Sequence, residues 1–220
     1  MIANDDPRLR LVAITDDLRD GIDGLVARAL SAQRGGVTML LLRLKHADAR
    51  SVVEAGRALV PALRIPVVVS ERLDVALACN AAGVHLTSRS VPVVAIRPHV
   101  PNGFLVGGSI SSAVDIDPAS HADYVTIGPV FGDAATSIGI EVFRRFARAS
   151  GRPAIAIGGI EPANVAAVRA IGASGVAVIR AVLGTENPAG AASALMAAID
   201  APAATSREQK DRDDGGSSVV

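Results

Sequence analysis

Short apolar runs alternate with amphipathic segments along almost the whole chain. The runs are rich in Val, Ile and Leu and show no polar alternation, which is typical of strands buried on both faces of a parallel sheet. We therefore predict one strand in each of eight runs: Leu11–Ile14, Thr38–Leu42, Pro66–Val69, Gly83–Leu86, Leu105–Gly108, Tyr124–Ile127, Ala154–Ile157 and Gly175–Ile179.

The segments between these runs carry apolar residues with the helical period. After the second run, Asp48 stands where an acid favours a helix N-terminus. One face of that helix would be formed by Val52, Val53, Gly56, Leu59, Val60 and Leu63. The connections Ser90–Pro98 and Ser111–Ala122 are short and irregular, so we expect their helices to be the least regular.

Strands that alternate with helices in this way predict a closed parallel barrel, a single (β/α)8 TIM barrel over residues 1–200. A doubly wound open sheet is the alternative. It would normally carry a glycine-rich fingerprint after its first strand, whereas Ile14 is followed by Thr15, Asp16 and Asp17. Residues 201–220 shift to Ser, Asp, Lys, Arg and Gly, which predicts a disordered C-terminal tail.

The amino-acid composition argues against several classes of protein. The chain has 220 residues, 22 Lys and Arg against 22 Asp and Glu, and only 2% aromatic residues. This balance offers no basic face or stacking platform for nucleic acid. Cys79 is the single cysteine, so a disulfide scaffold is excluded. No signal-peptide core and no membrane-length apolar run is present. We expect a cytoplasmic protein with no membrane partner, and a homo-oligomer is compatible with the sequence.

Two groups of residues near the predicted strand ends point to phosphate chemistry. Barrel enzymes build their sites at the carboxyl ends of their strands. The glycines in Ile157–Ile160 let backbone N–H groups approach an anion, and Arg180 would add a charge after the last strand. A plain tight turn is the alternative. Arg43 and Lys45 end the second strand with two cations, and a solvated pair beside an apolar strand is the alternative to an anion site. Together, the two cationic groups suggest a ligand that carries phosphate at one or both ends.

Other candidates are weaker when taken alone. His85 lies inside an apolar strand, where a lone histidine is more often a hydrogen-bonded core residue than a catalyst. Glu71 offers one carboxylate, which makes a poor magnesium site unless phosphates supply the other oxygens. No spacing of His, Cys and acids is typical of a zinc site.

Several motifs occur in the order found in one family of small barrels, and the chain resembles the thiamine-phosphate synthase/TenI family from about Leu9 to Ile199. The motifs are Leu11-Val12-Ala13-Ile14-Thr15-Asp16, Arg43-x-Lys45, Arg72-x-Asp74-Val75-Ala76-Leu77, Gly83-Val84-His85-Leu86, Asp123-Tyr124-Val125-x-Ile127-Gly128-Pro129-Val130-Phe131 and Ala156-Ile157-Gly158-Gly159-Ile160.

The resemblance implies an enzyme of thiamine biosynthesis. The synthase joins a thiazole phosphate to a hydroxymethylpyrimidine diphosphate and releases pyrophosphate, using magnesium. Carried over by position, it implies catalytic roles for Arg43, Lys45, His85 and Ser109 and a metal-binding role for Glu71. It also implies that substrate is bound by Ser70, Thr136, Gly158, Gly159, Ile179 and Arg180.

The chain departs from the synthase pattern on the pyrophosphate and magnesium side. Ser70 and Glu71 replace an Asn-Asp pair, Ser90 replaces the second magnesium aspartate, and Thr136 stands at or near the place of a lysine. Two alternatives follow: a TenI-like thiazole tautomerase, and a non-catalytic barrel that binds a phosphorylated ligand. Against the tautomerase, Pro129 replaces the catalytic histidine of that branch.

Overall fold

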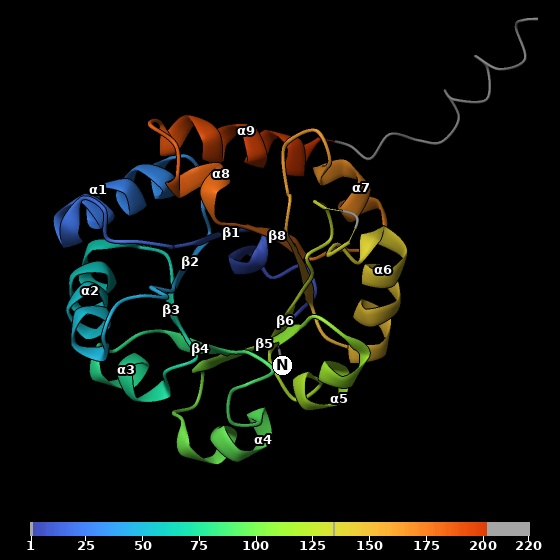
Figure 1. The fold of residues 1–220 in the computed structure, drawn as a ribbon, viewed down its shortest axis with the longest axis horizontal. Coiled ribbons are helices and arrows are strands. Elements are labelled where there is room, and N and C mark those ends of the chain that lie inside the picture. Colours follow the sequence, from blue (N-terminus) through green and yellow to red (C-terminus); the bar gives the residue numbers. More distant parts are fainter. Residues whose placement is uncertain (1, 134, 202–220) are drawn as a thin grey trace, which may run out of the picture.

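A closed barrel of eight parallel strands forms the centre of the molecule, and helices surround it (Figure 1). The computed structural model describes residues 2–133 and 135–201. Each strand pairs with the next, and the barrel closes where Ala13 of the first strand pairs with Val178 of the last. The predicted TIM barrel is therefore confirmed. The strands are β1 (Leu11–Ile14), β2 (Met39–Leu42), β3 (Val67–Ser70), β4 (Gly83–Leu86), β5 (Leu105–Ile110), β6 (Tyr124–Ile127), β7 (Ala154–Ile157) and β8 (Gly175–Val178).

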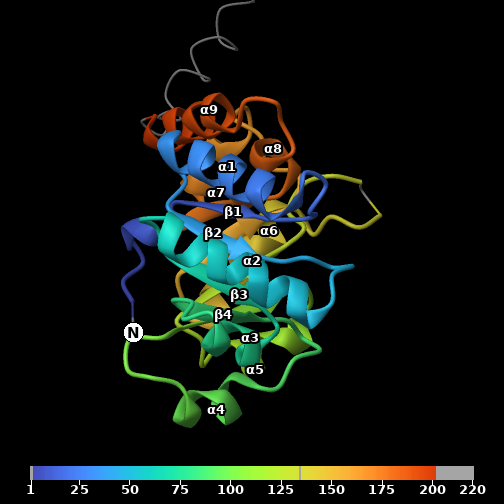
Figure 2. The same ribbon diagram turned by 90° about the vertical axis from the view of Figure 1, so that its left-hand side faces the viewer.

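The helices follow the strands in order and lie outside them (Figures 1 and 2). Those after β4 and β5 are single turns, as the irregular connections predict. The α-helices are α1 (Gly21–Arg34), α2 (Ala49–Ala62), α3 (Leu73–Ala78), α4 (Val93–Ile96), α5 (Ile116–Ala119), α6 (Gly139–Ser150), α7 (Val165–Ala170), α8 (Arg180–Leu183) and α9 (Pro188–Asp200). Short 3-10 turns lie at Pro7–Leu9, Arg97–His99 and Ala113–Asp115. The expected tail lies outside the described residues except for Ala201.

The apolar core has two parts, because alternate residues of each strand face opposite sides of the sheet. One set, including Val84, Val106 and Val125, packs against the helices. The other set fills the barrel interior, where Tyr124 and Ile155 are almost completely buried. Burying each such side chain contributes roughly 1.5–3 kcal/mol. The continuous apolar runs of the sequence follow from this double burial.

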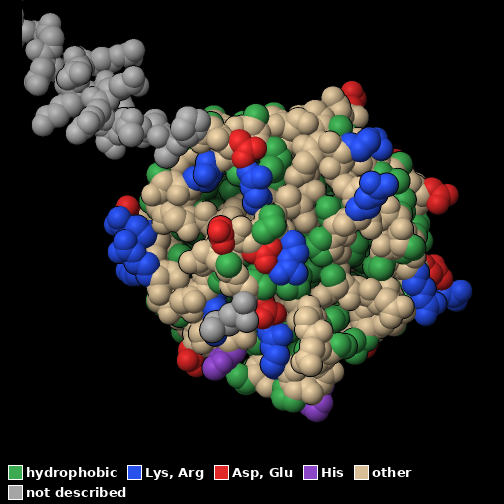
Figure 3. All heavy atoms as spheres, turned by 180° about the vertical axis from the view of Figure 1, so that it is seen from behind, with side chains coloured by type: hydrophobic (Ala, Val, Ile, Leu, Met, Phe, Trp, Pro, Cys, Tyr) green, Lys and Arg blue, Asp and Glu red, His purple; other side chains and the backbone are tan. Residues whose placement is uncertain are grey.

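The two ends of the barrel differ. At the amino end, Leu9 is buried and ion pairs join Asp6 to Arg8 and Arg97 to Asp123. Figure 3 shows this face, where acidic and basic side chains lie side by side. The loops that follow the strands lie at the opposite end (Figure 2). Within the described residues, no helix is both long and apolar enough to cross a membrane.

Candidate active site

The predicted site residues lie near the carboxyl ends of the strands or in the loops that follow them, so the closed barrel brings them to one end. Arg43 and Lys45 follow β2, Glu71 follows β3, and Arg180 begins α8 after β8. Ser70 is the last residue of β3, while His85 and Ser109 lie within β4 and β5. Gly158 and Gly159 follow β7, and Ile179 follows β8. Thr136 lies in the loop between β6 and α6.

The two cations after β2 project from an anchored segment. The Thr15 hydroxyl, at the end of β1, accepts a hydrogen bond of 2.8 Å from the Arg43 N–H and donates one of 3.0 Å to the Arg43 carbonyl. Leu44 is buried between the two cations, while Arg43 is half-buried and Lys45 is exposed. Neither cationic side chain forms an ion pair with another described residue. Their charge is therefore available to an anionic ligand.

The ends of β3 and β4 are joined through Glu71. Its N–H donates to the His85 carbonyl at 2.8 Å, and its Oε1 accepts from the Thr87 hydroxyl at 2.6 Å. The Thr87 N–H donates to the Ser90 hydroxyl at 3.0 Å. The position that the resemblance gives to a second magnesium aspartate, Ser90, thus lies in the same network as Glu71.

The side chains near Glu71 determine whether this end of the barrel could bind Mg²⁺. No group of three His, Cys, Asp or Glu side chains that could hold a metal occurs among residues 2–133 and 135–201. Mg²⁺ is often bound by one or two carboxylates together with substrate phosphates. The residues present therefore fit a magnesium ion that enters with a diphosphate and meets Glu71, and they do not form a protein-built cage.

His85 lies inside the barrel with two hydroxyl groups at its Nε2 atom. Ser109 Oγ is 3.0 Å from Nε2 and Thr126 Oγ1 is 3.1 Å from it. The imidazole stacks on the Tyr124 ring with 5.5 Å between the ring centroids. Burial lowers the pKa of His85 to about 4, so the imidazole is neutral at pH 7. Burial also raises the pKa of Tyr124 well above its ordinary value.

Thr126 is a polar residue of this site that sequence reasoning missed. The apolar run Tyr124–Ile127 predicts a strand, and a threonine within it gives no sign of function because Thr is a common strand former. One signal could have identified it. Thr126 lies two residues after Tyr124, on the same face of β6, and Thr126 is the register partner of Ser109. An inward Ser beside an inward Thr indicates a polar pair in the barrel.

The loop after β7 and the start of α8 line one pocket, which includes Gly158, Gly159 and Arg180. Both glycines have positive φ, 96° and 61°. Among the described residues, the N–H groups of Gly158, Gly159 and Ile160 have no backbone acceptor. These donors and the exposed Arg180 guanidinium are suited to a phosphate group.

Close packing of the two loops is a second, purely structural reason for glycine at positions 158 and 159. The Val130 N–H donates to the Ile157 carbonyl at 2.8 Å, which brings the loop after β6 against the loop after β7. A Cβ on Gly158 would lie 2.4 Å from Pro129 Cβ, and one on Gly159 would lie 2.7 Å from the Phe131 backbone. A side chain at either position would therefore displace the neighbouring loop, whether or not a ligand binds.

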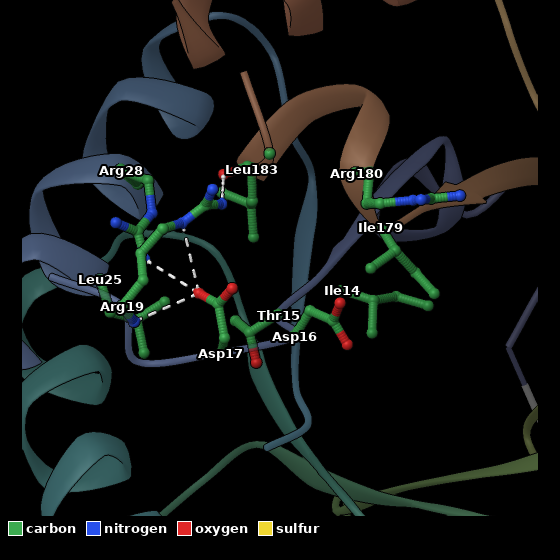
Figure 4. Close-up of a pocket in the computed structure, with 11 residues that line it drawn as sticks. Ile14, Thr15, Asp16, Asp17, Arg19, Leu25, Arg28, Ile179, Arg180 and Leu183 are labelled. Carbon is green, nitrogen blue, oxygen red and sulfur yellow. Dashed lines mark hydrogen bonds and ion pairs between the residues drawn. The ribbon is translucent and has the colours of Figure 1, made fainter. Parts of the chain in front are cut away.

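A second pocket lies between β1 and α8 (Figure 4). Asp17 lies 3.4 Å from Arg19 and 3.8 Å from Arg28, and Arg19 also donates to the Leu183 carbonyl at 3.2 Å. These contacts join the loop after β1 to the end of α8. Arg180 points away from the Asp17 pairs and forms no ion pair with a described residue. Its charge is therefore available in the mouth.

Thr136 is not brought into contact with the other predicted site residues. It is exposed, and its hydroxyl donates to the Asp133 carbonyl of its own loop at 3.3 Å. Ala134, in the same loop, lies outside the described residues.

Fold and site together define a (β/α)8 barrel whose mouth carries cations and backbone N–H groups that have no partner among the described residues. The family model described as thiamine monophosphate synthase matches residues 11–182. The chain belongs to this family, as its resemblance predicts.

Curated relatives support the assignment. The chain is 38% identical over 196 residues to the thiamine-phosphate synthase of Roseiflexus sp. (strain RS-1), covering 84% of this chain and 83% of that protein. It is 40% identical over 187 residues to the thiamine-phosphate synthase of Methanoculleus marisnigri, covering 80% of this chain and 88% of that protein.

Solved structures agree. The thiamine phosphate pyrophosphorylase from Pyrococcus furiosus superposes with a TM-score of 0.78 at 33% identity, covering 88% of this chain and 96% of that one. A 3-hexulose-6-phosphate synthase superposes with a TM-score of 0.64 at 20% identity, covering 86% of this chain and 99% of that one, which shows a shared fold only.

Proposed function

We propose that this protein is a transferase of the thiamine-phosphate synthase type. It joins a thiazole phosphate to a hydroxymethylpyrimidine diphosphate and releases pyrophosphate. One observation carries the proposal beyond family membership. Two separate groups at the same mouth are suited to anions: the cations after β2, which form no ion pair with a described residue, and the glycine loop after β7 together with Arg180 after β8. A reaction between two phosphorylated substrates needs both.

Arg43 and Lys45 serve the diphosphate. In the reaction the C–O bond to the diphosphate breaks, and its electron pair leaves with the pyrophosphate. The pyrimidine methylene becomes cationic, and the thiazole nitrogen forms the new C–N bond to it. Fixed cations beside the departing group stabilise the charge that develops on it, which is the largest catalytic contribution expected here. Magnesium, when bound with the diphosphate at Glu71, adds to this neutralisation.

The glycine loop and Arg180 serve the thiazole phosphate. The free N–H groups after β7 and the guanidinium of Arg180 hold the phosphate end, so the ring extends over the mouth toward the other substrate. Ser70, Ser109 and neutral His85 lie between the two anion-binding places in barrel order. Ser70 and Ser109 are half-buried and are proposed to contact the two rings, while His85 lies buried beside Ser109.

The departures from the synthase sequence pattern should weaken binding on the pyrophosphate and magnesium side. Ser90 and Thr136 bring no charge to the pyrophosphate side, so we expect weak magnesium binding and a high KM for the diphosphate. The other expectations remain part of the proposal: a cytoplasmic enzyme whose partners are small phosphorylated heterocycles, compatible with a homo-oligomer.

Calorimetric titration tests the two places separately. Thiazole phosphate alone is expected to bind without magnesium, and the pyrimidine diphosphate is expected to bind more tightly with magnesium than without it. Binding of thiazole phosphate alone, with no binding of the diphosphate under either condition, would favour the TenI-like or non-catalytic alternatives.

A further inference from the structure

Three polar groups from adjacent strands form a closed triangle inside the barrel. His85 Nε2 lies 3.0 Å from Ser109 Oγ and 3.1 Å from Thr126 Oγ1, and the two hydroxyl oxygens are 3.4 Å apart. His85 and Thr126 are buried, with 3% and 5% of their surface exposed. Ser109 is the half-buried member. Ser109 is therefore the member of the triangle that can contact a ligand at the mouth.

The position of the imidazole proton follows from the surroundings of its two nitrogens. Neutral His85 carries one N–H. Nδ1 is buried and has no hydrogen-bond partner among the described residues. It faces Gly107, where even a Cβ would lie 2.3 Å from it. A buried N–H without an acceptor is rare and costly. The proton therefore belongs on Nε2, where two hydroxyl oxygens can accept it.

The hydroxyl protons are then ordered in turn. Nε2 donates into the pair of oxygens, and the Thr126 hydroxyl donates to Ser109 Oγ. Ser109 thus accepts from inside the barrel. No group of the triangle is left to accept the Ser109 proton, because Nε2 and Thr126 both act as donors. The Ser109 proton is therefore left for an acceptor outside the triangle, on the half-buried side of the residue.

We propose that Thr126 is a positioning residue that acts with His85 to fix Ser109 as a hydrogen-bond donor toward an anionic oxygen of bound substrate. The inference rests on the proposed function for the identity of that oxygen, which belongs to the diphosphate. Thr126 itself stays buried beneath Ser109 and does not touch the substrate.

A spectroscopic experiment tests the triangle without any reaction. In protein labelled with 15N-histidine, His85 is expected to be the Nε2–H tautomer at pH 7. Its resonances are assigned by their loss in His85→Gln. If that variant does not fold, replacing the exposed His46, His99 and His121 with Asn leaves His85 as the remaining histidine. Thr126→Val should shift the Nε2 resonances, and Thr126→Ser should restore them. An Nδ1–H tautomer, or no change in Thr126→Val, would overturn the proposal.

A double-mutant cycle tests the action through Ser109. Thr126→Val is nearly isosteric and should lower kcat roughly tenfold with little change in KM, and Thr126→Ser should restore kcat. In a Ser109→Ala background, Thr126→Val should have no further effect. An equal loss in both backgrounds would overturn the positioning role, because packing alone would then explain it. If the wild-type protein makes no thiamine phosphate, the proposed function fails, while the tautomer measurement still decides the triangle.

Discussion

The Thr87 hydroxyl donates a hydrogen bond of 2.6 Å to Oε1 of Glu71 and joins the carboxyl ends of β4 and β3. Glu71 has a φ of 65°, a left-handed conformation that costs a non-glycine residue roughly 1–2 kcal/mol. A charged side chain held at a barrel mouth in such a conformation indicates a functional residue. Stability alone would favour glycine at this position.

Glu71→Gly should separate stability from activity. Relief of the left-handed strain offsets the loss of the Thr87 contact and the extra freedom of glycine in the unfolded chain. We expect the free energy of unfolding, measured by urea denaturation, to change by less than about 1 kcal/mol. The rate of thiamine phosphate formation should fall at least tenfold. Glu71→Gln, which retains an acceptor for Thr87, should raise the magnesium concentration needed for half-maximal rate. A Glu71→Gly variant that is strongly destabilised yet fully active would disprove this account.

The two anion-binding places should respond to different substitutions. Arg180→Ala is expected to weaken thiazole phosphate binding about tenfold and to leave the affinity for the diphosphate unchanged. Arg43→Ala should do the reverse, because its charge lies after β2. Titration calorimetry measures both. The matched control is Arg50→Ala, since Arg50 is exposed on α2 and paired with Glu54 at 2.9 Å. If Arg180→Ala and Arg43→Ala weaken both ligands equally, the separation of the two places is wrong.

His85 should make stability depend on pH in the acid range. Burial lowers its folded-state pKa from 6.5 to about 4, so below pH 6.5 the unfolded chain binds a proton that the folded protein does not. Stability is complete above pH 6.5 and falls by about 3 kcal/mol as the pH drops to 4.

His85→Gln is the control for that measurement and should flatten the slope between pH 6.5 and 4. The pKa of Asp6 is lowered chiefly by its hydrogen bond from Arg8, so its contribution is lost in a lower range, below its ordinary value of 3.8. Identical slopes for wild type and His85→Gln in urea denaturation would show that His85 does not titrate in this way.

Gly158→Ala should cost more stability than strain alone explains. Its φ of 96° disfavours any side chain, and the new Cβ would lie 2.4 Å from Pro129 Cβ. We expect a loss of roughly 2–4 kcal/mol together with loss of thiazole phosphate binding. Gly151→Ala is the control, because Gly151 also has positive φ but a Cβ there would meet nothing within 4 Å. It should lose only about 1 kcal/mol. Equal losses in the two variants would contradict the close packing of the two loops.

The fold could be predicted from the sequence because strands that are buried on both faces appear as continuous apolar runs. β1, β4, β6 and β7 begin and end at the predicted residues. Thr38 and Pro66 each lie one residue before their strands, and Pro66 has no N–H that could donate to the sheet.

The candidate site could be predicted only in part from the sequence. The order of the strands predicts which residues share the mouth, but contacts between side chains depend on register and inward direction. Thr126 was missed for that reason, and so was the link from Thr87 to Glu71. The left-handed backbone of Glu71 has no signal in the residue type, because glutamate rarely adopts it. Thr136 is the opposite case. The resemblance predicts that it binds substrate, whereas its hydroxyl donates to the Asp133 carbonyl of its own loop.

Formation of thiamine phosphate is the most direct test of the central claim. Purified protein is mixed with thiazole phosphate, hydroxymethylpyrimidine diphosphate and magnesium, and thiamine phosphate and pyrophosphate are both quantified over time. We predict that the two products appear in equal amounts, and that the combined Arg43→Ala and Lys45→Ala variant forms at least tenfold less. No thiamine phosphate from protein that binds both substrates would contradict the account.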